Sequence, residues 1–253
     1  LLANGVHLIG RSFKYHRPRG IYTCGIEEPN ALVQILNEHN EPNTRATIKR
    51  VYDGIKVSSQ NRWPSLSFDV GSINNFLSPI FSAGFYYKTF MGPKGFWKKI
   101  YEPLIRRTAG LGKPPKNFRS KSIHQNHNVD ILIVGGGLTG LMAARKFINT
   151  KHEVLLVEQD AFLGGILKNS NKVNTINGKD VKDWVDETEK LIIKANNIKI
   201  LKNTLVTTYN FTNHLIALED KFAGKKIDTN KSELTLHKIR TDNTILANGH
   251  IER

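Results

Sequence analysis

The most constraining feature of this sequence is an apolar run that ends in a glycine-rich turn. Residues 131–140 read Ile-Leu-Ile-Val-Gly-Gly-Gly-Leu-Thr-Gly, and a second apolar run at 154–157 ends on Glu158. Helical patterning over 141–148 separates the two runs. A strand, a G-x-G-x-x-G turn, a helix, a second strand and an acid about 20 residues beyond the turn are together typical of a dinucleotide-binding βαβ unit.

Each position in this unit has a chemical reason. Gly135 allows the tight turn out of the strand, Gly137 has no side chain to keep a pyrophosphate off the backbone, and Gly140 lets helix and strand pack closely. The pyrophosphate is expected at the helix N-terminus, where unpaired N–H groups and the helix dipole favour an anion. Glu158 is expected to accept hydrogen bonds from both ribose hydroxyls, which favours NAD or FAD over a 2′-phosphorylated ligand.

Two further segments are expected to return to the same ligand. Gly164-Gly165 follows Glu158 at a spacing typical of two-dinucleotide-binding-domain flavoproteins. Residues 244–250 resemble the strand and Ala-Thr-Gly turn of that family, although Asn248 stands at the threonine position, so this turn lacks the hydroxyl. The expected cofactor-binding residues are Gly135, Gly136, Gly137, Leu138, Thr139, Gly140, Glu158, Gln159, Gly164, Gly165, Val206, Ala247, Asn248 and Gly249.

Other patterns extend the βαβ unit into a larger α/β domain. Short strands are expected at 198–201, 205–211, 215–218 and 232–239. Apolar residues also recur at helical spacing after position 180, and this stripe is expected to be core. Its members are Val181, Trp184, Val185, Thr188, Leu191, Ile192 and Ala195.

The first 128 residues have a different character. Residues 1–60 are rich in turns, with β-like runs at 31–36, 47–52 and 55–58, and Asp53-Gly54 predicts a two-residue hairpin between the last two. Residues 61–128 are rich in proline, glycine and aromatic residues, and they end in a polar tract at 120–128 that predicts a linker. Both ends of the chain look interrupted, so we expect a fragment of a longer protein.

A formal charge of +15 raises the question of a nucleic-acid partner. The basic residues are spread along the chain, with the densest stretch at 88–119. Aromatic residues within it could stack bases. Packing of these aromatics on a neighbour, with the charges in solvent or facing an acidic partner subunit, is the commoner arrangement, so no nucleic acid is expected. The aromatic residues concerned are Phe90, Phe96, Trp97, Tyr101 and Phe118.

Composition also bears on location and metal binding. No apolar run approaches the ~20 residues of a membrane span, and no signal peptide is visible, so no membrane partner is expected. The single cysteine, Cys24, excludes an internal disulfide and fits a reducing compartment, for which cytoplasm is the expectation. His7 and His16 lack a second ligand at a useful spacing, so no metal site is expected.

Residues 10–21, followed by Cys24-Gly25, resemble the cluster loop of a plant-type ferredoxin. Such a loop holds iron with thiolates at C-x4-C-x2-C. Counted from Cys24, the next two ligands would be Pro29 and Leu32, and neither side chain binds iron. We therefore expect no iron–sulfur cluster and interpret Cys24 as a small buried apolar residue.

Taken in chain order, these segments resemble the alpha subunit of heterotetrameric sarcosine oxidase. The resemblance rests on the cluster-less loop, on residues 11–19, 78–90 and 101–110, and on the dinucleotide fold that follows. A related amine-oxidising or cyanide-forming family shares the architecture but usually keeps the cluster cysteines, so Pro29 and Leu32 favour the sarcosine oxidase branch.

The fold class that follows is α/β. A Rossmann-like domain of the three-layer, two-dinucleotide-binding-domain flavoprotein type is expected over residues 129–253, truncated at its C-terminus, as an FAD/NAD(P)-binding domain. It is preceded by a small α+β ferredoxin-like domain that lacks cluster cysteines, at 1–60, and by a connector at 61–128.

The resemblance implies a mechanism shared between subunits, in an oxidoreductase that acts on CH–NH donors. Sarcosine is demethylated to glycine at an FAD in the beta subunit, and electrons pass through an FMN at the alpha–beta interface to oxygen, giving hydrogen peroxide. The one-carbon unit leaves as formaldehyde or methylene-tetrahydrofolate through a C-terminal folate domain that this chain lacks. The alpha fold itself holds NAD, and further small subunits complete the hetero-oligomer. By this analogy the chain binds a cofactor and carries no catalytic residue.

Two alternatives remain from the residues alone. The spacing of Glu158 to Gly164-Gly165 is commoner among FAD sites, so the chain could be an FAD-dependent amine or amino-acid dehydrogenase subunit of the related cyanide-forming, opine-oxidising or proline-oxidising group. The third possibility is a redox-silent subunit that uses its dinucleotide only as structure.

Overall fold

The chain forms two compact units in the computed structural model. The first unit comprises residues 1–119 with 224–226, and the second comprises residues 120–223 with 227–253. The residues that the structure describes are 1–23, 25–37, 40–79, 84, 90, 92–108, 121–168, 175–210, 212–228 and 231–249.

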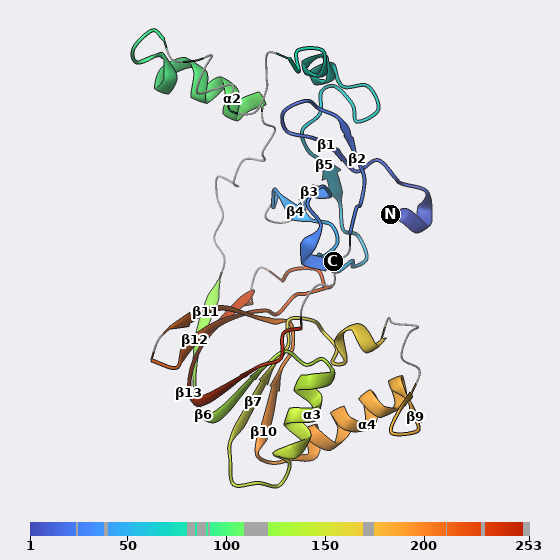
Figure 1. The fold of residues 1–253 in the computed structure, drawn as a ribbon, viewed down its shortest axis with the longest axis vertical. Helices are drawn as coiled ribbons and strands as arrows, with labels where there is room; N and C mark the ends of the chain where they lie inside the picture. Colours follow the sequence, from blue (N-terminus) through green and yellow to red (C-terminus); the bar gives the residue numbers. More distant parts are fainter. Residues whose placement is uncertain are drawn as a thin grey trace. The chain divides into compact units, whose positions relative to one another are not determined.

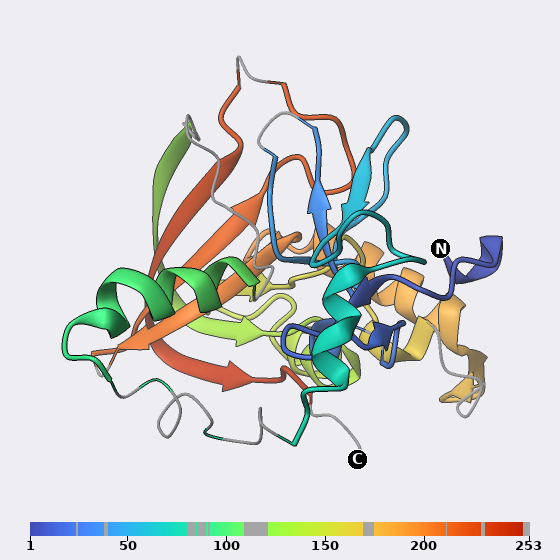
Figure 2. The same cartoon turned by 90° about the horizontal axis from the view of Figure 1, so that it is seen from above.

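The second unit is built on a six-stranded sheet in the order β10-β7-β6-β13-β12-β11 (Figure 1). The first four strands are parallel to one another, and β11 and β12 continue the sheet in antiparallel pairing. Figure 2 shows the strands at visibly different angles, as in a twisted sheet. The strand bounds are Ser122–Val134 (β6), Val154–Val157 (β7), Ile198–Leu201 (β10), Thr204–Asn210 (β11), His214–Asp220 (β12) and Leu234–Leu246 (β13).

Two apolar clusters cover the sheet. All four residues of β7 are buried, as expected of a parallel strand that is covered on both faces. One cluster joins Ile133 and Leu156 to α3 (Leu138–Lys146) and α4 (Val181–Lys194), which lie on the same side of the sheet in Figure 1. The other joins Leu132 and Leu155 to Leu215 and Ala217 of β12 and to Ile239 of β13. These features confirm the predicted α/β fold class.

The helix expected after position 180 is present as α4. It begins at Asp180, whose side chain accepts the N–H of Lys182 and so caps the helix. The apolar stripe is buried except at Leu191, whose side chain is 46% exposed, so the prediction of a core position is wrong for this residue. Two short strands, β8 (Thr175–Ile176) and β9 (Lys179–Asp180), pair just before the helix.

The polar tract at 120–128 is not a linker where the structure describes it. From Ser122 onward it is the first part of β6 and pairs in parallel with Leu234–Arg240 of β13. Nε2 of His127 lies 2.9 Å from Nδ1 of His237, whose Nε2 lies 3.1 Å from a carboxylate oxygen of Glu219 on β12. Backbone pairing and this polar chain across three strands replace the apolar contacts that the tract lacks. The prediction of a connector is therefore wrong for residues 122–128.

The first unit contains two small sheets. Strand β3 (Leu32–Ile35) lies between β4 (Thr44–Arg45) and β5 (Val57–Ser59), and β1 (Gly10–Arg11) pairs with β2 (Pro18–Arg19). All these pairings are antiparallel. The core of the unit comprises Ile9, Ala31, Val33 and Ile35.

The hairpin expected around Asp53-Gly54 is only a turn. The N–H of Ile55 donates to the carbonyl of Tyr52 at 3.2 Å, which closes the turn. Residues 47–52 form no strand, however, because β5 takes its partner from β3 and not from the segment just before it. The predicted strand at 47–52 is therefore wrong.

The segment expected to be a connector contains helical turns. A 3₁₀ segment spans Val70–Asn75, and a π-helical turn at Trp97–Tyr101 leads directly into α2 (Glu102–Thr108). Shorter 3₁₀ turns lie at Leu2–Asn4, Gly25–Glu27 and Gly165–Lys168. Among the described residues, no helix is long and apolar enough to cross a membrane.

Candidate functional site

The glycine loop connects the carboxyl end of β6 to α3, and its first and last glycines are required by backbone packing. Gly135 has a φ of 101°, a conformation that side-chain-bearing residues rarely adopt. A Cβ at Gly135 would collide with the carbonyl oxygen of Ala247, and a Cβ at Gly140 would collide with that of Gly135. The tight turn and the close helix–strand contact predicted for these two positions are both present.

Gly137 is different, because nothing in the described protein requires it to be glycine. Its φ is −71°, and no atom lies within 4 Å of where a Cβ would be. It is the N-cap of α3 and supplies no side-chain hydrogen bond to the helix, so the first N–H groups have no capping acceptor. Leu138 and Thr139 in the first turn are exposed. The loop therefore has open space beside an uncapped helix N-terminus, which is where a pyrophosphate would fit.

Glu158 at the end of β7 closes onto the glycine loop. Its side chain is only 6% exposed, and one carboxylate oxygen accepts the N–H of Gly136 at 2.6 Å. The other oxygen accepts the N–H of Asp160 at 2.8 Å. A Cβ at Gly136 would lie 3.0 Å from the carboxylate, so the middle glycine allows this approach. Because a carboxylate offers about four acceptor positions, these bonds leave capacity for hydroxyl donors.

The double glycine lies against the same loop. The N–H of Gly164 donates to the carbonyl of Gly136 at 2.8 Å, and a Cβ at Gly165 would lie 3.4 Å from the Cα of Gly137. Gly164 has a φ of 106°, so glycine is favoured there by the backbone itself. The neighbouring Leu163 is fully buried and anchors the segment in the core.

The return turn at the end of β13 completes the arrangement. The N–H of Ala247 donates to the carbonyl of Val134 at 2.8 Å, and Asn248 borders Gly135 through its Cα. Asn248 and Gly249 are exposed, as is Gln159 beside the acid. The structure thus brings the predicted glycine loop, acid, double glycine and return turn together, although they are spread over more than 100 positions of the sequence.

Val206 is the one predicted residue that the described contacts do not bring to the glycine loop. It is on β11, whose first residue, Thr204, donates its N–H to the backbone carbonyl of Glu158 at 2.9 Å. Its side chain packs against the apolar cluster that contains Leu132 and Leu155. The backbone bond to Glu158 is thus made by Thr204, and the observed contacts of Val206 are those of a core residue.

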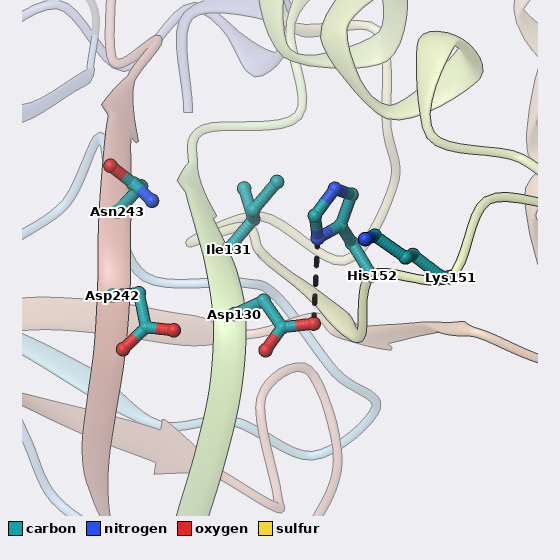
Figure 3. Close-up of a pocket in the computed structure, with 6 residues that line it drawn as sticks. All are labelled: Asp130, Ile131, Lys151, His152, Asp242 and Asn243. Atoms are coloured by element: carbon teal, nitrogen blue, oxygen red, sulfur yellow. Dashed lines mark ion pairs between the residues drawn. The ribbon is translucent and has the colours of Figure 1, made fainter.

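A pocket of about 300 Å³ lies elsewhere, where β7 begins (Figure 3). A carboxylate oxygen of Asp130 lies 3.6 Å from Nδ1 of His152 and accepts the N–H of Glu153 at 2.9 Å. These contacts hold the loop that enters β7, and no predicted site residue lines the pocket. Within the described ranges, no group of three or more His, Cys, Asp or Glu side chains is placed to hold a metal ion.

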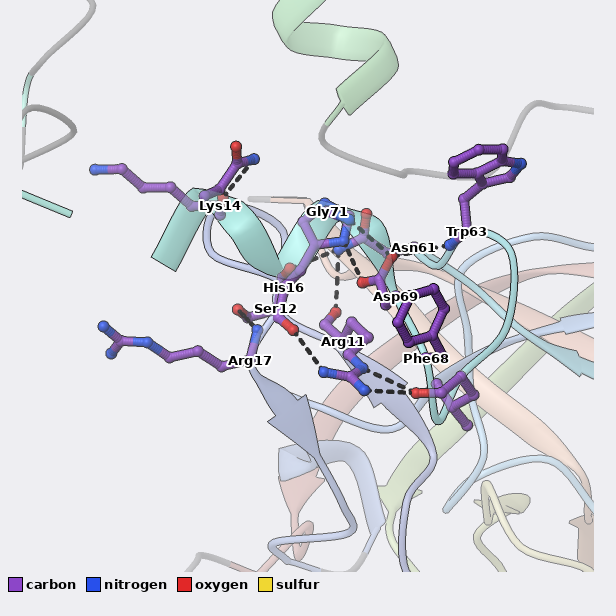
Figure 4. Close-up of polar contacts among 12 residues, drawn as sticks. Arg11, Ser12, Lys14, His16, Arg17, Asn61, Trp63, Phe68, Asp69 and Gly71 are labelled. Carbon is purple, nitrogen blue, oxygen red and sulfur yellow. Dashed lines mark hydrogen bonds and ion pairs between the residues drawn. The ribbon is translucent and has the colours of Figure 1, made fainter. Parts of the chain in front are cut away.

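In the first unit, a buried histidine–carboxylate pair and an arginine tie two distant segments together (Figure 4). Nδ1 of His16 lies 2.6 Å from a carboxylate oxygen of Asp69, whose other oxygen accepts the N–H groups of Trp63 and Gly71. Arg11 donates to three backbone carbonyls, including that of His16. This pair could not be predicted from the sequence, because its members are 53 positions apart and no short motif joins them.

The arrangement in the second unit is that of an FAD-type dinucleotide-binding fold. Residues 130–227 match a family described as FAD dependent oxidoreductase, and residues 1–62 match a 2Fe-2S iron-sulfur cluster binding domain. Among solved structures, L-proline dehydrogenase from P. horikoshii aligns with a TM-score of 0.53 at 19% identity, over 98% of this chain and 36% of that chain. At this identity the alignment shows the fold alone.

The particular relatives confirm the resemblance found in the sequence. The chain is 47% identical over 210 residues to sarcosine oxidase subunit alpha of Rhizobium meliloti (strain 1021), over 81% of this chain and 21% of that protein. It is 27% identical over 264 residues to the same subunit of Corynebacterium sp. (strain P-1), over 100% of this chain and 22% of that protein. The chain is thus a homologue of sarcosine oxidase alpha subunits and spans about a fifth of their length.

Proposed function

We propose that this chain is the dinucleotide-binding part of an oxidoreductase subunit. The observation that carries the proposal is the open space at Gly137, beside an uncapped helix N-terminus and next to a buried carboxylate. These are the features that recognise the ADP half common to FAD and NAD: N–H donors and a positive dipole end for the pyrophosphate, and an acid for the ribose.

Some of the site residues set the shape of the loop, and others bind the ligand through charge and hydrogen bonds. Gly135 and Gly140 hold the loop close to β6 and α3, and the first turn of α3, with Leu138 and Thr139, presents its N–H groups. Glu158 accepts the ribose hydroxyls with the acceptor capacity that remains beside its two backbone bonds. The remaining predicted residues that lie at the glycine loop complete the border of the site: Gln159, Gly164, Gly165, Ala247, Asn248 and Gly249. Val206 packs in the core of the sheet and is assigned no contact with the ligand.

FAD is the dinucleotide best supported for this site. The match of residues 130–227 to FAD-dependent oxidoreductases favours it, as does the spacing from Glu158 to Gly164-Gly165. NAD, which the resemblance to the alpha subunit implied, shares the same ADP half and is the alternative. When bound, either group supplies hydride acceptance, and the chain supplies its binding and orientation.

We further propose that the whole protein works as a sarcosine oxidase alpha subunit, within a hetero-oligomer that contains a beta subunit and further small subunits. The names of both relatives support this proposal. The assembled enzyme then demethylates sarcosine to glycine, with FAD and FMN in the complex, and passes its one-carbon unit to tetrahydrofolate or releases formaldehyde. In this proposal the glycine loop supplies no amine-oxidising group, because amine oxidation needs titratable side chains near the flavin. Thr139 is the only hydroxyl residue in the loop, and neither His nor Lys lies between Val129 and Ala144.

The test has two arms, both on the full-length subunit co-expressed with its neighbouring gene. Mass spectrometry of the released ligand identifies FAD or NAD, and the absence of any dinucleotide would contradict the binding proposal. Sarcosine turnover, followed as peroxide release, is expected only with the beta partner present. Peroxide from the alpha subunit alone would move the chemistry into it and favour an FAD-dependent dehydrogenase. A bound dinucleotide that no substrate reduces would instead favour a redox-silent subunit.

A further inference from the structure

A carboxylate is buried in the first unit, and among the described residues its hydrogen-bond donors are backbone amides. The side chain of Glu28 has no exposed surface. One of its oxygens accepts the N–H groups of Tyr22 and Thr23, each at 2.6 Å. The other accepts those of Asn30 and Ala31, at 2.7 and 3.1 Å. Four donors from two sides of one loop therefore converge on a single anion.

This arrangement is a binding site for negative charge. Backbone N–H groups that converge in a loop form concavities that bind phosphates and iron–sulfur clusters. Burial raises the pKa of Glu28, but the four backbone hydrogen bonds outweigh burial and leave the pKa below its ordinary value. The Glu28 side chain is therefore ionised near neutral pH. The four residues that donate to it are all uncharged, so the loop stabilises this negative charge with backbone N–H groups.

Glu28 lies within the segment that resembles a cluster-binding loop. It directly precedes Pro29, which occupies the second ligand position of the expected cluster motif. Residues 1–62 match a 2Fe-2S cluster binding domain. In such domains thiolates hold the cluster, and its sulfurs also accept hydrogen bonds from the protein. The four amides of residues 22, 23, 30 and 31 flank the same motif.

We propose that the Glu28 carboxylate is a built-in anion that takes the place of an iron–sulfur cluster as the acceptor on which loop 22–31 folds. A loop shaped to surround an anionic cluster is left with inward-pointing N–H donors once the ligand cysteines are lost. Buried donors without acceptors are costly, and one glutamate satisfies four of them. The loop thus keeps its ferredoxin-like conformation while Pro29 and Leu32 remove the ligands. The proposal presupposes that no cluster binds, and it is independent of the dinucleotide site.

Two substitutions separate the role of the charge from that of the side-chain volume. Glu28→Gln keeps the shape, but its amide group turns a donor toward two of the four N–H groups. Glu28→Ala removes the carboxylate and leaves room for a small anion supplied from solution. Glu27→Gln is the matched control, because Glu27 is the adjacent residue and is exposed.

The experiment is hydrogen exchange of the full-length protein, followed by mass spectrometry on peptides that span residues 20–33. Glu28→Gln is expected to speed exchange there by about tenfold or more, because the amides lose their acceptor, whereas Glu27→Gln leaves it unchanged. In Glu28→Ala, added formate is expected to slow exchange again, in a saturable way. Wild-type protection in Glu28→Gln, or no response of Glu28→Ala to formate, would overturn the proposal.

Two further measurements separate this proposal from the prediction that no cluster binds and from the proposed dinucleotide site. Iron and acid-labile sulfide are determined on the same wild-type protein, and stoichiometric amounts of both would overturn the inference by showing a real cluster. Dinucleotide content is expected to be equal in wild type and Glu28→Gln, since the loop belongs to the other compact unit. Should Glu28→Ala fail to fold, Glu28→Asp replaces it: its shorter side chain withdraws the carboxylate from part of the donor set, and intermediate exchange is expected.

Discussion

The carboxylate of Glu158 accepts the N–H of Gly136 at 2.6 Å, so the acid that ends β7 is bonded directly to the glycine loop. Sequence patterns of this type assign the acid to the ribose alone. Here it also fixes the middle of the loop, and its other oxygen holds the N–H of Asp160 at the start of the next segment. Loop shape and ribose recognition therefore depend on the same side chain.

Replacement of this acid should affect both stability and binding. In Glu158→Ala the buried N–H of Gly136 loses its acceptor, which we expect to lower the free energy of unfolding by about 1–3 kcal/mol. Binding also loses one or two charge-assisted hydrogen bonds to the ribose, each worth ~1.5–3 kcal/mol, so dinucleotide retention should fall about tenfold or more. Ligand content after gel filtration and thermal unfolding measure the two effects.

Asp160→Asn is the control for this variant, because the bond from residue 160 to Glu158 uses the backbone and the Asp160 side chain is exposed. It should match wild type in both measurements. Nucleotide retention that is unchanged in Glu158→Ala would contradict the assignment of the ribose to this acid.

The candidate site was predictable because its physical requirements are local. The turn at Gly135, the close contact at Gly140 and the acid after β7 all follow from how one strand, one helix and a second strand must meet. Gly164-Gly165 and Ala247 were found by spacing and by the form of the final strand. Val206 shows the limit of this approach, since its neighbours are core residues of the sheet.

The errors have a common cause, which is that partners distant in sequence decide the outcome. The polar tract before residue 129 becomes a strand because His127 and the backbone around it find partners on β13, about 110 positions away. The predicted strand at 47–52 does not form because β5 pairs with β3 and not with the segment just before it. The pairing of His16 with Asp69 and the burial of Glu28 likewise had no local pattern. Residues 80–83, 85–89, 91 and 109–120 of the predicted connector lie outside the described residues.

Two glycines of one loop should respond differently to the same substitution. Gly140→Ala places a Cβ against the carbonyl of Gly135, and since this is backbone the loop must shift, at a cost of about 1–3 kcal/mol. Gly137→Ala meets no protein atom and should leave stability nearly unchanged. Its methyl group nevertheless occupies the space proposed for the pyrophosphate.

We therefore expect Gly140→Ala to unfold at a lower temperature, and Gly137→Ala to unfold like the wild type once the ligand has been removed but to retain less dinucleotide. Differential scanning calorimetry of ligand-free protein and ligand content after purification measure these two quantities. Full dinucleotide occupancy in Gly137→Ala would exclude a pyrophosphate at this position.

The buried carboxyl of Asp69, bonded to His16 in the first unit, predicts a specific dependence of stability on pH. Burial raises the pKa of Asp69, but the N–H groups of Trp63 and Gly71 and the ring of His16 outweigh burial, and the pKa lies below its ordinary value. A carboxyl with a depressed pKa in the folded state stabilises the protein above its unfolded pKa of about 3.9, and this contribution is lost as the pH falls through the folded value.

Asp69→Asn should accordingly lower the free energy of unfolding of the first unit by about 1.5–3 kcal/mol at neutral pH. The difference from wild type should begin to shrink below about pH 4, where the carboxyl becomes protonated in the unfolded chain, and shrink further as the pH approaches the lower pKa of the folded state. Unfolding curves recorded from pH 3 to pH 7 measure it, with the exposed Asp53→Asn as the control. A difference that stays constant over this range would show that the charge of Asp69 does not stabilise the fold.

The absence of an iron–sulfur cluster is itself a prediction, despite the match of residues 1–62 to a cluster-binding domain. Pro29 has no ligand atom in its side chain, and Leu32 begins β3, where its backbone pairs with Arg45. Iron and acid-labile sulfide should both be absent from full-length protein purified without oxygen, and anaerobic incubation with iron and sulfide should not introduce a visible absorption band.

Leu32→Cys alone should not change this result, because a cluster of this type needs four protein ligands and position 29 still supplies none. Stoichiometric iron and sulfide in the wild type would show that the ligand positions have been misaligned with this loop.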